Sequence, residues 1–183
     1  MNFFQFNEVI ENFIGFQIYC DLDGVLVDLE EGLVQKMHLH DKPTRIEILK
    51  DLSQLKKQGH DLSDLFAELP WMKDGKDLWT YLLPYEPFIL TAANVETQKE
   101  ICEGKKKWCS EHLQLPDDKL ICEHKKEKYA GYRKILIDDW SRNIKEWEKA
   151  GGIGILHRSA SETIGKLKDL IVSDDSKNPL AVI

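Results

Sequence analysis

Short apolar runs, each about as long as one strand, recur along the chain between longer polar stretches. They occupy residues 16–21, 87–91, 119–122, 134–138 and 152–156. Within each run the apolar residues are continuous, which is typical of strands that are covered on both faces in a parallel sheet. Apolar residues at helical spacing occur between these runs, in residues 95–113, 141–150 and 159–172. Strands that alternate with helices predict an α/β fold, with a doubly wound parallel sheet and helices on both faces.

One interval breaks this alternation. Residues 29–85 separate the first run from the second, although a parallel crossover needs only about a dozen residues. The interval carries four helical patterns, in residues 29–40, 44–57, 62–69 and 75–83, with proline and glycine between them. We therefore predict a Rossmann-like core domain formed by residues 1–28 and 86–183, and a small helical cap, residues 29–85, inserted after the first strand and standing over the strand ends.

The charge balance and the cysteines narrow the class of protein. With 25 Lys and Arg against 32 Asp and Glu, the net charge is −7, so we expect neither duplex nucleic acid nor an anionic membrane as a partner. No stretch reaches the roughly 18 to 20 apolar residues of a membrane span, and no pattern indicates an oligomer. The four cysteines show neither a CxxC pair nor a small-domain disulfide framework. They predict a cytoplasmic protein whose thiols mostly serve packing.

The first apolar run ends in two aspartates, within "IYCDLDGVLVD". Side chains i and i+2 of a strand share one face, so Asp21 and Asp23 are expected to point to one spot. Two neighbouring carboxylates resist ionising together unless a cation or a shared proton offsets their repulsion. The plainer interpretation is an acidic strand end that caps a helix.

Polar groups follow three of the other runs as well. Asp138 and Asp139 end the fourth run, Thr91 ends the second with Ala92 after it, and residues 122–130 carry lysines. If the strands are neighbours, four carboxylates meet at one sheet edge, where Mg²⁺ is the fitting cation because it prefers oxygen ligands. The threonine hydroxyl and the backbone amides after it can bind an anionic oxygen. A metal, a hydroxyl and an ammonium around one carboxylate nucleophile predict a phosphoryl-transfer site.

In this order the motifs resemble those of the haloacid dehalogenase (HAD) superfamily of phosphohydrolases. "DLDGV" is similar to its first motif, Thr91 to its second, a lysine within residues 125–128 to its third, and the pair Asp138 and Asp139 to its fourth. Val25 stands where many members have threonine. The segments "DLDGVLVD", "ILTAAN" and "ILIDDWSRNI" most resemble the branch of the 5'(3')-deoxyribonucleotidases, which place a helical cap where this chain has its insertion.

The resemblance implies a Mg²⁺-dependent phosphatase that forms an aspartyl phosphate. Asp21 would attack phosphorus, and Asp23 would protonate the leaving oxygen and then activate water. The metal would be held by Asp21, the backbone carbonyl of Asp23 and Asp138, with Asp139 in support. These assignments make the chain a phosphoric monoester hydrolase.

The resemblance also implies the groups that hold the phosphoryl oxygens. These are Thr91 with Ala92, and one lysine of the third motif. Lys125, Lys126 and Lys128 are all within reach of that role, and we choose Lys126 because "KEKYA" resembles the pattern in which the first lysine is functional.

The substrate is a small phosphorylated metabolite, and the branch resemblance favours a nucleoside monophosphate. Trp71, with Trp79, Tyr81 and Tyr85, can either stack on a nucleobase or pack in the core. A sugar phosphatase, a phosphatase of nucleic-acid 3' ends and a catalytically idle HAD-fold binding protein are the alternatives. The run of lysines at residues 105–107 is expected to be the solvated face of a helix.

Overall fold

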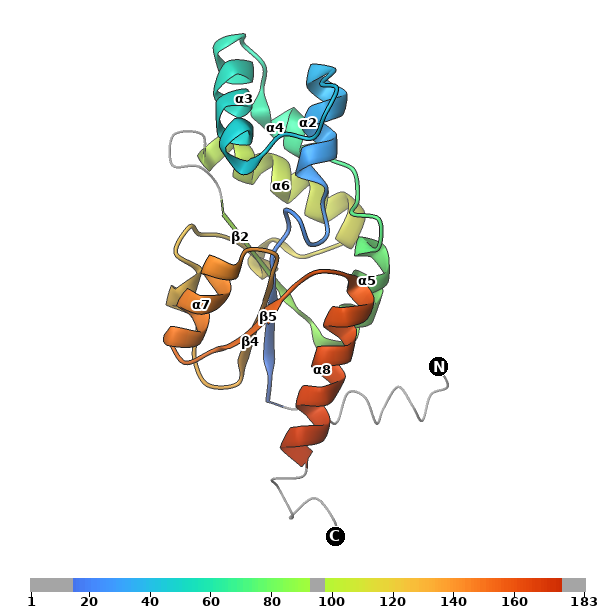
Figure 1. Ribbon diagram of the computed structural model, residues 1–183, viewed down its shortest axis with the longest axis vertical. Helices are drawn as coiled ribbons and strands as arrows, with labels where there is room; N and C mark the ends of the chain where they lie inside the picture. The colour runs from blue at the N-terminus through green and yellow to red at the C-terminus, as the bar shows by residue number, and fades with distance from the viewer. Residues whose placement is uncertain (1–14, 93–97, 176–183) are drawn as a thin grey trace.

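A five-stranded parallel sheet with helices on both faces forms the centre of the computed structural model, which describes residues 15–92 and 98–175 (Figure 1). The strand order is β3–β2–β1–β4–β5, and every pairing is parallel. The strands are β1 (Gln17–Cys20), β2 (Phe88–Thr91), β3 (Leu120–Cys122), β4 (Lys134–Asp138) and β5 (Ile153–Leu156). The predicted Rossmann-like α/β fold is confirmed, with each strand inside its predicted run.

The strands are mainly apolar because both faces of the sheet are covered. Ile18 and Cys20 of β1 point to the face covered by α5 (Gly75–Leu82), α6 (Gln98–Leu113) and α8 (Ala160–Asp175). Tyr19 points to the opposite face, where Ile144 and Trp147 of α7 (Ser141–Lys149) pack against it. The residues from Ile18 to Cys20 are therefore buried on both faces of the sheet, and they do not alternate with polar residues.

The interval predicted to form a cap, residues 29–85, contains four α-helices, which are α2 (Leu29–Met37), α3 (Arg45–Lys57), α4 (Leu62–Ala67) and α5. Helix α2 begins at Asp28, whose carboxylate accepts a 2.9 Å hydrogen bond from the Glu31 amide, and α3 begins with a capping box between Thr44 and Glu47. In Figure 1, α2, α3 and α4 lie above the sheet, whereas α5 lies beside α8. One hydrophobic core runs from the sheet into these helices. The domain boundaries stay a prediction.

Short 3₁₀ helices complete the described chain. They are η1 (Leu83–Tyr85), η2 (Asp117–Lys119) and η3 (Lys126–Tyr129). The last of these lies between β3 and β4 and begins at the lysine chosen above. The first few residues of the helix expected at 95–113 lie outside the described residues, as does most of the chain before β1.

The longest described helices are short for a membrane span. Helices α6 and α8 have 16 residues each, and α6 is rich in charged residues. Within residues 15–92 and 98–175, no helix has both the length and the apolar character that crossing a membrane requires.

The cysteines correct one part of the prediction. A disulfide joins Cys102 of α6 to Cys122 of β3, so these two are not packing thiols. Their separation of 20 residues gave no sign of pairing, because the contact depends on the crossover that returns the chain from α6 to the edge of the sheet. Cys20 and Cys109 are buried free thiols, and burial raises the pKa of Cys109 to about 12 and that of Cys20 well above its usual value. These two are packing residues, as predicted.

Candidate active site

Three carboxylates meet at the carboxyl end of the sheet because their strands are neighbours. Cys20 of β1 is in register with Ile137 of β4, so the residues that follow them, Asp21 and Asp138, emerge side by side. The amide of Asp21 continues the ladder with a 2.8 Å hydrogen bond to the carbonyl of Ile137. One oxygen each of Asp21, Asp138 and Asp139 lies within 4.8 Å of the others. The structure thus brings together three of the four acids expected to surround a metal.

Asp138 is the most enclosed of these carboxylates, with 0% of it exposed. Its Oδ1 accepts a hydrogen bond from the amide of Trp140 (2.8 Å), and its Oδ2 accepts from Asn143 Nδ2 (2.8 Å). Burial and the neighbouring charge of Asp21 raise the pKa of Asp138 to about 6, although Lys126 and Asn143 act in the opposite direction. The site therefore resists holding both carboxylates ionised without an additional cation.

Lys126 lies between the two acids, at the start of η3. Its Nζ is 2.8 Å from Asp21 Oδ1 and 2.6 Å from Asp138 Oδ2, and the residue is 2% exposed. Burial lowers the pKa of Lys126, but the two carboxylates outweigh burial and raise it above its usual value. Lys125 and Lys128 are not placed in this way, since Lys125 is exposed and Lys128 pairs with a glutamate outside the acidic group. Of the three candidate lysines, Lys126 is thus the one that contacts Asp21 and Asp138, and its catalytic role stays a prediction.

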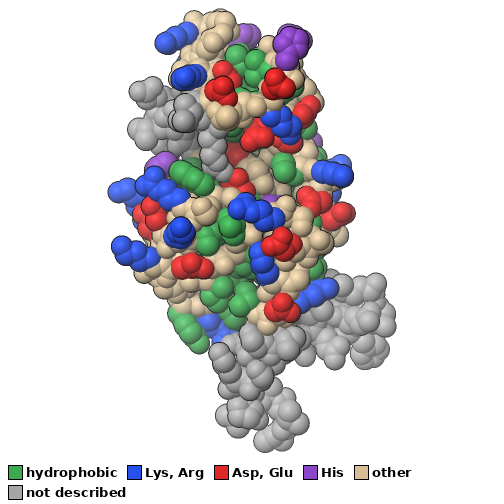
Figure 2. Space-filling view, viewed as in Figure 1, with side chains coloured by type: hydrophobic (Ala, Val, Ile, Leu, Met, Phe, Trp, Pro, Cys, Tyr) green, Lys and Arg blue, Asp and Glu red, His purple; other side chains and the backbone are tan. Residues whose placement is uncertain are grey.

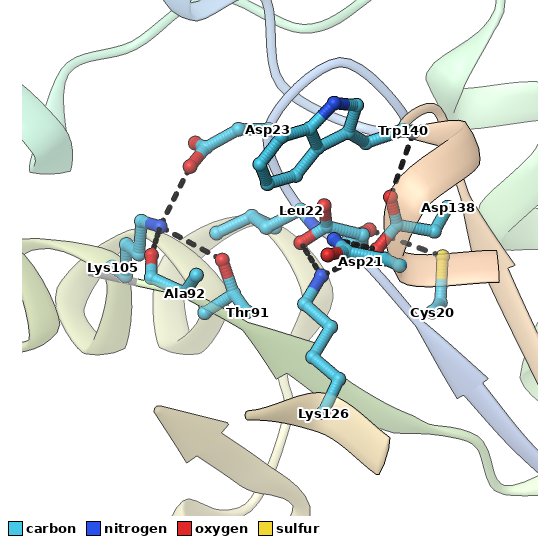
Figure 3. A network of polar contacts seen from close by, with 11 residues as sticks. Cys20, Asp21, Leu22, Asp23, Thr91, Ala92, Lys105, Lys126, Asp138 and Trp140 are labelled. Atoms are coloured by element: carbon cyan, nitrogen blue, oxygen red, sulfur yellow. Dashed lines mark hydrogen bonds and ion pairs between the residues drawn. The ribbon is translucent and has the colours of Figure 1, made fainter. Parts of the chain in front are cut away.

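Asp23 points away from the other acids, contrary to the expectation from strand alternation. Strand β1 ends at Cys20, and the turn that follows directs Asp23 Oδ2 to Lys105 Nζ, at 2.7 Å (Figure 3). Gly24 makes this turn possible through its positive φ of 77°, and a side chain there would meet the carboxylate of Asp139. Asp21 and Asp23 still line the same cavity, but each has its own ammonium partner. A metal contact of the Asp23 backbone carbonyl stays a prediction.

Thr91 and Ala92 occupy the end of β2, next to β1. The Thr91 hydroxyl is fully buried and accepts a 2.7 Å hydrogen bond from Lys105 Nζ, and the Ala92 carbonyl accepts another at 2.6 Å. Ala92 lines the cavity. Both residues are thus close to Asp23, with Lys105 as the group that connects them.

Lys105 is the site residue that the sequence analysis missed. It was expected on the solvated face of α6, but its side chain is 1% exposed, whereas those of Lys106 and Lys107 are each 53% exposed. The prediction is therefore wrong for Lys105 and right for its two neighbours. The available signal was its spacing, because Ile101, Lys105, Trp108 and Cys109 lie at i, i+4, i+7 and i+8, the apolar stripe of an amphipathic helix. A lysine inside such a stripe indicates a buried charge with a partner.

A cavity of about 860 Å³ lies over these groups, between the strand ends and the cap. Its floor includes Asp21, Asp23 and Lys126, and its apolar wall includes Ile48, Leu52 and Phe66. Figure 2 shows acidic side chains gathered where the upper helical part of the molecule meets the part that contains the sheet. The cavity is larger than a phosphate ion needs, so it has room for an organic group attached to the phosphate.

The aromatic residues considered for base stacking lie elsewhere. Trp71 packs against Trp108, with ring centroids 4.7 Å apart, and Trp79 is buried in the core. Tyr81 and Tyr85 pack on each other, with centroids 5.7 Å apart. None of these four rings is among the described residues that line the cavity. The structure therefore does not bring Trp71 to the place where a substrate would bind.

The donor set fits a divalent cation. Oxygen atoms of Asp21, Asp138 and Asp139 converge, and they are the hard ligands that Mg²⁺ prefers. Together with Asp23 they carry four formal negative charges, against two positive charges on Lys105 and Lys126. The excess of acidic groups at this point favours a bound cation.

Comparisons with known proteins add little beyond the fold. No family model matches the chain, and no curated protein does. Among solved structures, a hydrolase from Streptococcus pneumoniae TIGR4 is 14% identical, with a TM-score of 0.47, over 85% of this chain and 97% of that one. An L-2-haloacid dehalogenase is 13% identical, with a TM-score of 0.46, over 76% and 82% of the two chains. A HAD-superfamily hydrolase from Ehrlichia chaffeensis is 11% identical, with a TM-score of 0.38, over 86% and 96%. With TM-scores below 0.5, these likenesses carry no argument about chemistry, which rests on the residues described above.

Proposed function

We propose that the chain is a Mg²⁺-dependent phosphomonoesterase of the HAD type, which hydrolyses a small phosphorylated metabolite through an aspartyl phosphate. The observation that carries the proposal is the position of Asp21. Its carboxylate lies at the floor of a cavity, 2.8 Å from a buried ammonium and beside two further acids that can hold a cation. A carboxylate nucleophile needs such neighbours, because it must approach an anionic phosphate ester.

The first step forms the aspartyl phosphate. Asp21 Oδ1 accepts hydrogen bonds from the Leu22 amide and from Lys126, so we assign the attack on phosphorus to Oδ2. The new bond joins this oxygen to phosphorus, and the bond from phosphorus to the ester oxygen breaks. Asp23 gives its proton to that leaving oxygen, which departs as an alcohol.

The second step restores the enzyme. Asp23, now ionised, takes a proton from a water molecule, whose oxygen attacks phosphorus. The bond between phosphorus and Asp21 breaks, and inorganic phosphate is released. Asp23 is protonated again at the end of the cycle, so the two steps balance.

The remaining groups stabilise the charge on the transferring phosphoryl group. Lys126 and the Thr91 hydroxyl would hold its oxygens, and backbone amides after β2 would assist. Asp21, Asp138 and the Asp23 carbonyl, with Asp139 in support, would hold Mg²⁺, which neutralises negative charge on the phosphoryl oxygens when bound.

A nucleoside monophosphate is the substrate that we propose, and motif resemblance is its main support. The cavity volume of about 860 Å³ admits a group of that size, and the rings of Phe66 and Trp140, not that of Trp71, line it. A cytoplasmic location and a helical cap of residues 29–85 belong to the same proposal. A panel of nucleoside monophosphates and sugar phosphates tests the substrate, and equal rates on both classes would contradict it.

Hydrolysis of p-nitrophenyl phosphate with Mg²⁺ tests the activity itself. We expect turnover by the wild type, and a loss of about four orders of magnitude or more in Asp21→Asn, because the amide cannot form the acyl phosphate. Lys128→Met is the matched control, since Lys128 is exposed and pairs with Glu123. An inactive wild type, or an unchanged rate in Asp21→Asn, would favour a catalytically idle binding protein.

A further inference from the structure

Lys105 connects three separate segments beside the proposed nucleophile. Its Nζ donates to Asp23 Oδ2 in the turn after β1 (2.7 Å), to Thr91 Oγ1 at the end of β2 (2.7 Å) and to the Ala92 carbonyl (2.6 Å). Figure 3 shows Lys105 and Lys126 as two distinct ammonium groups, one directed at Asp23 and the other at Asp21. The proposed acid/base and the proposed phosphate-binding strand end are thus held by one side chain.

The hydrogen-bond count excludes Lys105 as a phosphate ligand. An ammonium has three hydrogens and accepts none, and all three are used by these three acceptors. Thr91 Oγ1 must therefore accept from Lys105, which leaves the hydroxyl hydrogen to point elsewhere. The Thr91 hydroxyl therefore keeps its own hydrogen for a second acceptor, next to Ala92, which lines the cavity.

The same contact divides the two oxygens of Asp23 between different tasks. Oδ2 is engaged by Lys105, while Oδ1 is buried and has no hydrogen-bond partner among the described residues. A buried polar atom without a partner is costly unless a ligand or water completes its bonding. Oδ1 is thus the oxygen available for proton exchange with a leaving group.

Helix α4 covers Lys105, whose side chain is 1% exposed. Phe66 lies over the ammonium, with Nζ 5.5 Å from the ring centroid. The adjacent Gly104 allows this approach, because a Cβ at that position would collide with the Ser63 backbone and Phe66 Cβ. Hydrogen bonds in such a dry environment are stronger and better fixed in direction than exposed ones.

We propose that Lys105 is a positioning residue for phosphoryl transfer, which holds the Asp23 carboxylate for proton transfer and turns the Thr91 hydroxyl hydrogen toward the phosphoryl oxygen. The inference rests on the proposed function and adds to it a residue outside the four motifs. Lys105 lines the cavity, but its three ammonium hydrogens are already directed at Asp23, Thr91 and Ala92, so it acts through these partners.

Leaving-group dependence tests this role. An alkyl phosphate needs its leaving oxygen protonated, whereas p-nitrophenolate departs without that help. In Lys105→Met we expect kcat/KM to fall by about 100-fold for an alkyl phosphate and by less than about 10-fold for p-nitrophenyl phosphate, the difference being the contribution of general acid catalysis. Lys106→Met and Lys107→Met remove the same charge from exposed positions of the same helix, and should match the wild type for both substrates. Equal losses for the two substrates in Lys105→Met would overturn the proposal.

A double-mutant cycle tests whether Lys105 acts through Asp23. With the alkyl phosphate, Lys105→Met should cost little further activity once Asp23→Asn is present, because the group that it positions is already disabled. Losses that multiply would overturn the proposal. If Lys105→Met fails to fold, as judged by circular dichroism, Lys105→Gln replaces it, since the amide still donates to two of the three acceptors.

Affinity for inorganic phosphate separates a failure of this inference from a failure of the proposed function. Calorimetry with Mg²⁺ and phosphate requires no turnover. We expect Lys105→Met to weaken phosphate binding about 10-fold, because the Thr91 hydroxyl is then misdirected. Lys106→Met should bind phosphate as the wild type does. When Thr91→Val is already present, adding Lys105→Met should weaken phosphate binding no further. An inactive wild type with this binding pattern would remove the proposed hydrolysis and leave the positioning of Thr91 in place. Equal affinities in Lys105→Met and Lys106→Met would remove the positioning role.

Discussion

Asp138 makes the stability of the metal-free protein depend on pH. Its carboxyl is fully buried, and burial together with Asp21 raises its pKa from 3.8 to about 6. The informative perturbation is Asp138→Asn, which keeps the shape of the side chain and removes its charge. We compare this variant with the wild type in EDTA and in Mg²⁺.

The magnitude follows from linkage between protonation and folding. A pKa raised by roughly two units corresponds to about 3 kcal/mol, at about 1.4 kcal/mol per unit. Because the folded pKa lies above the unfolded one, the favourable contribution is complete below about pH 4 and is lost as the pH rises through about 6. Above pH 6 the folded metal-free protein must hold this carboxylate ionised, and a bound cation offsets that repulsion.

Urea unfolding between pH 4 and pH 8 measures the effect. In EDTA, we expect the unfolding free energy of the wild type to fall by up to about 3 kcal/mol relative to Asp138→Asn between pH 4 and pH 7. In Mg²⁺ at pH 7 the wild type should instead be more stable than Asp138→Asn, because the wild type gains the free energy of Mg²⁺ binding and the variant lacks one metal ligand. A difference between the two proteins that stays constant across this pH range in EDTA would refute the reasoning.

Three further perturbations follow from other contacts. Gly104→Ala should lower the unfolding free energy by about 1 to 3 kcal/mol, because the added Cβ overpacks against α4. Gly165→Ala is the control, and it should be neutral or slightly stabilising because a Cβ there meets nothing within 4 Å. Urea unfolding measures both variants, and equal changes in unfolding free energy would contradict the packing described. Cys102→Ser should lower the unfolding free energy by about 3 kcal/mol, because it opens the disulfide loop. A thiol titration of the wild type, denatured without reductant, should find two free thiols, and four would contradict the disulfide. In steady-state kinetics, Lys126→Met should abolish phosphatase activity, whereas the rate of Lys128→Met should stay within about twofold of the wild type. Similar rates in the two variants would argue against the choice of Lys126.

The strands were predictable because their burial is a local property of the sequence. The middle of a strand covered on both faces must be apolar, so β4 was located by its run Ile135, Leu136 and Ile137. The position of Asp21 beside Asp138 follows from the same patterns, since parallel strands release their side chains at one edge of the sheet. The order of the strands in the sequence and the usual topology of parallel sheets were sufficient to predict the strands and the proximity of Asp21 and Asp138.

Features that depend on the packing of distant segments were not predictable in the same way. Lys105 is buried because α4 lies over it, and the sequence around it resembles an exposed basic helix. Cys102 and Cys122 pair only after the crossover has folded. Trp71, which follows α4, packs against Trp108 of α6, and α4 and α6 are themselves in close contact. The sequence around Trp71 did not indicate which residue would be its partner.

The central place of β1 in the sheet has a consequence for the growing chain on the ribosome. One edge of β1 pairs with β2, and the other pairs with β4, which is made more than a hundred residues later. Until residues 134–138 have emerged, one edge of β1 lacks its hydrogen-bonding partner and is open to unwanted pairing. Such distant contacts form slowly, so a nascent chain brings Asp21 and Asp138 together only after β4 has been made. Products truncated before β4 will therefore lack the group of three acids and be prone to aggregate.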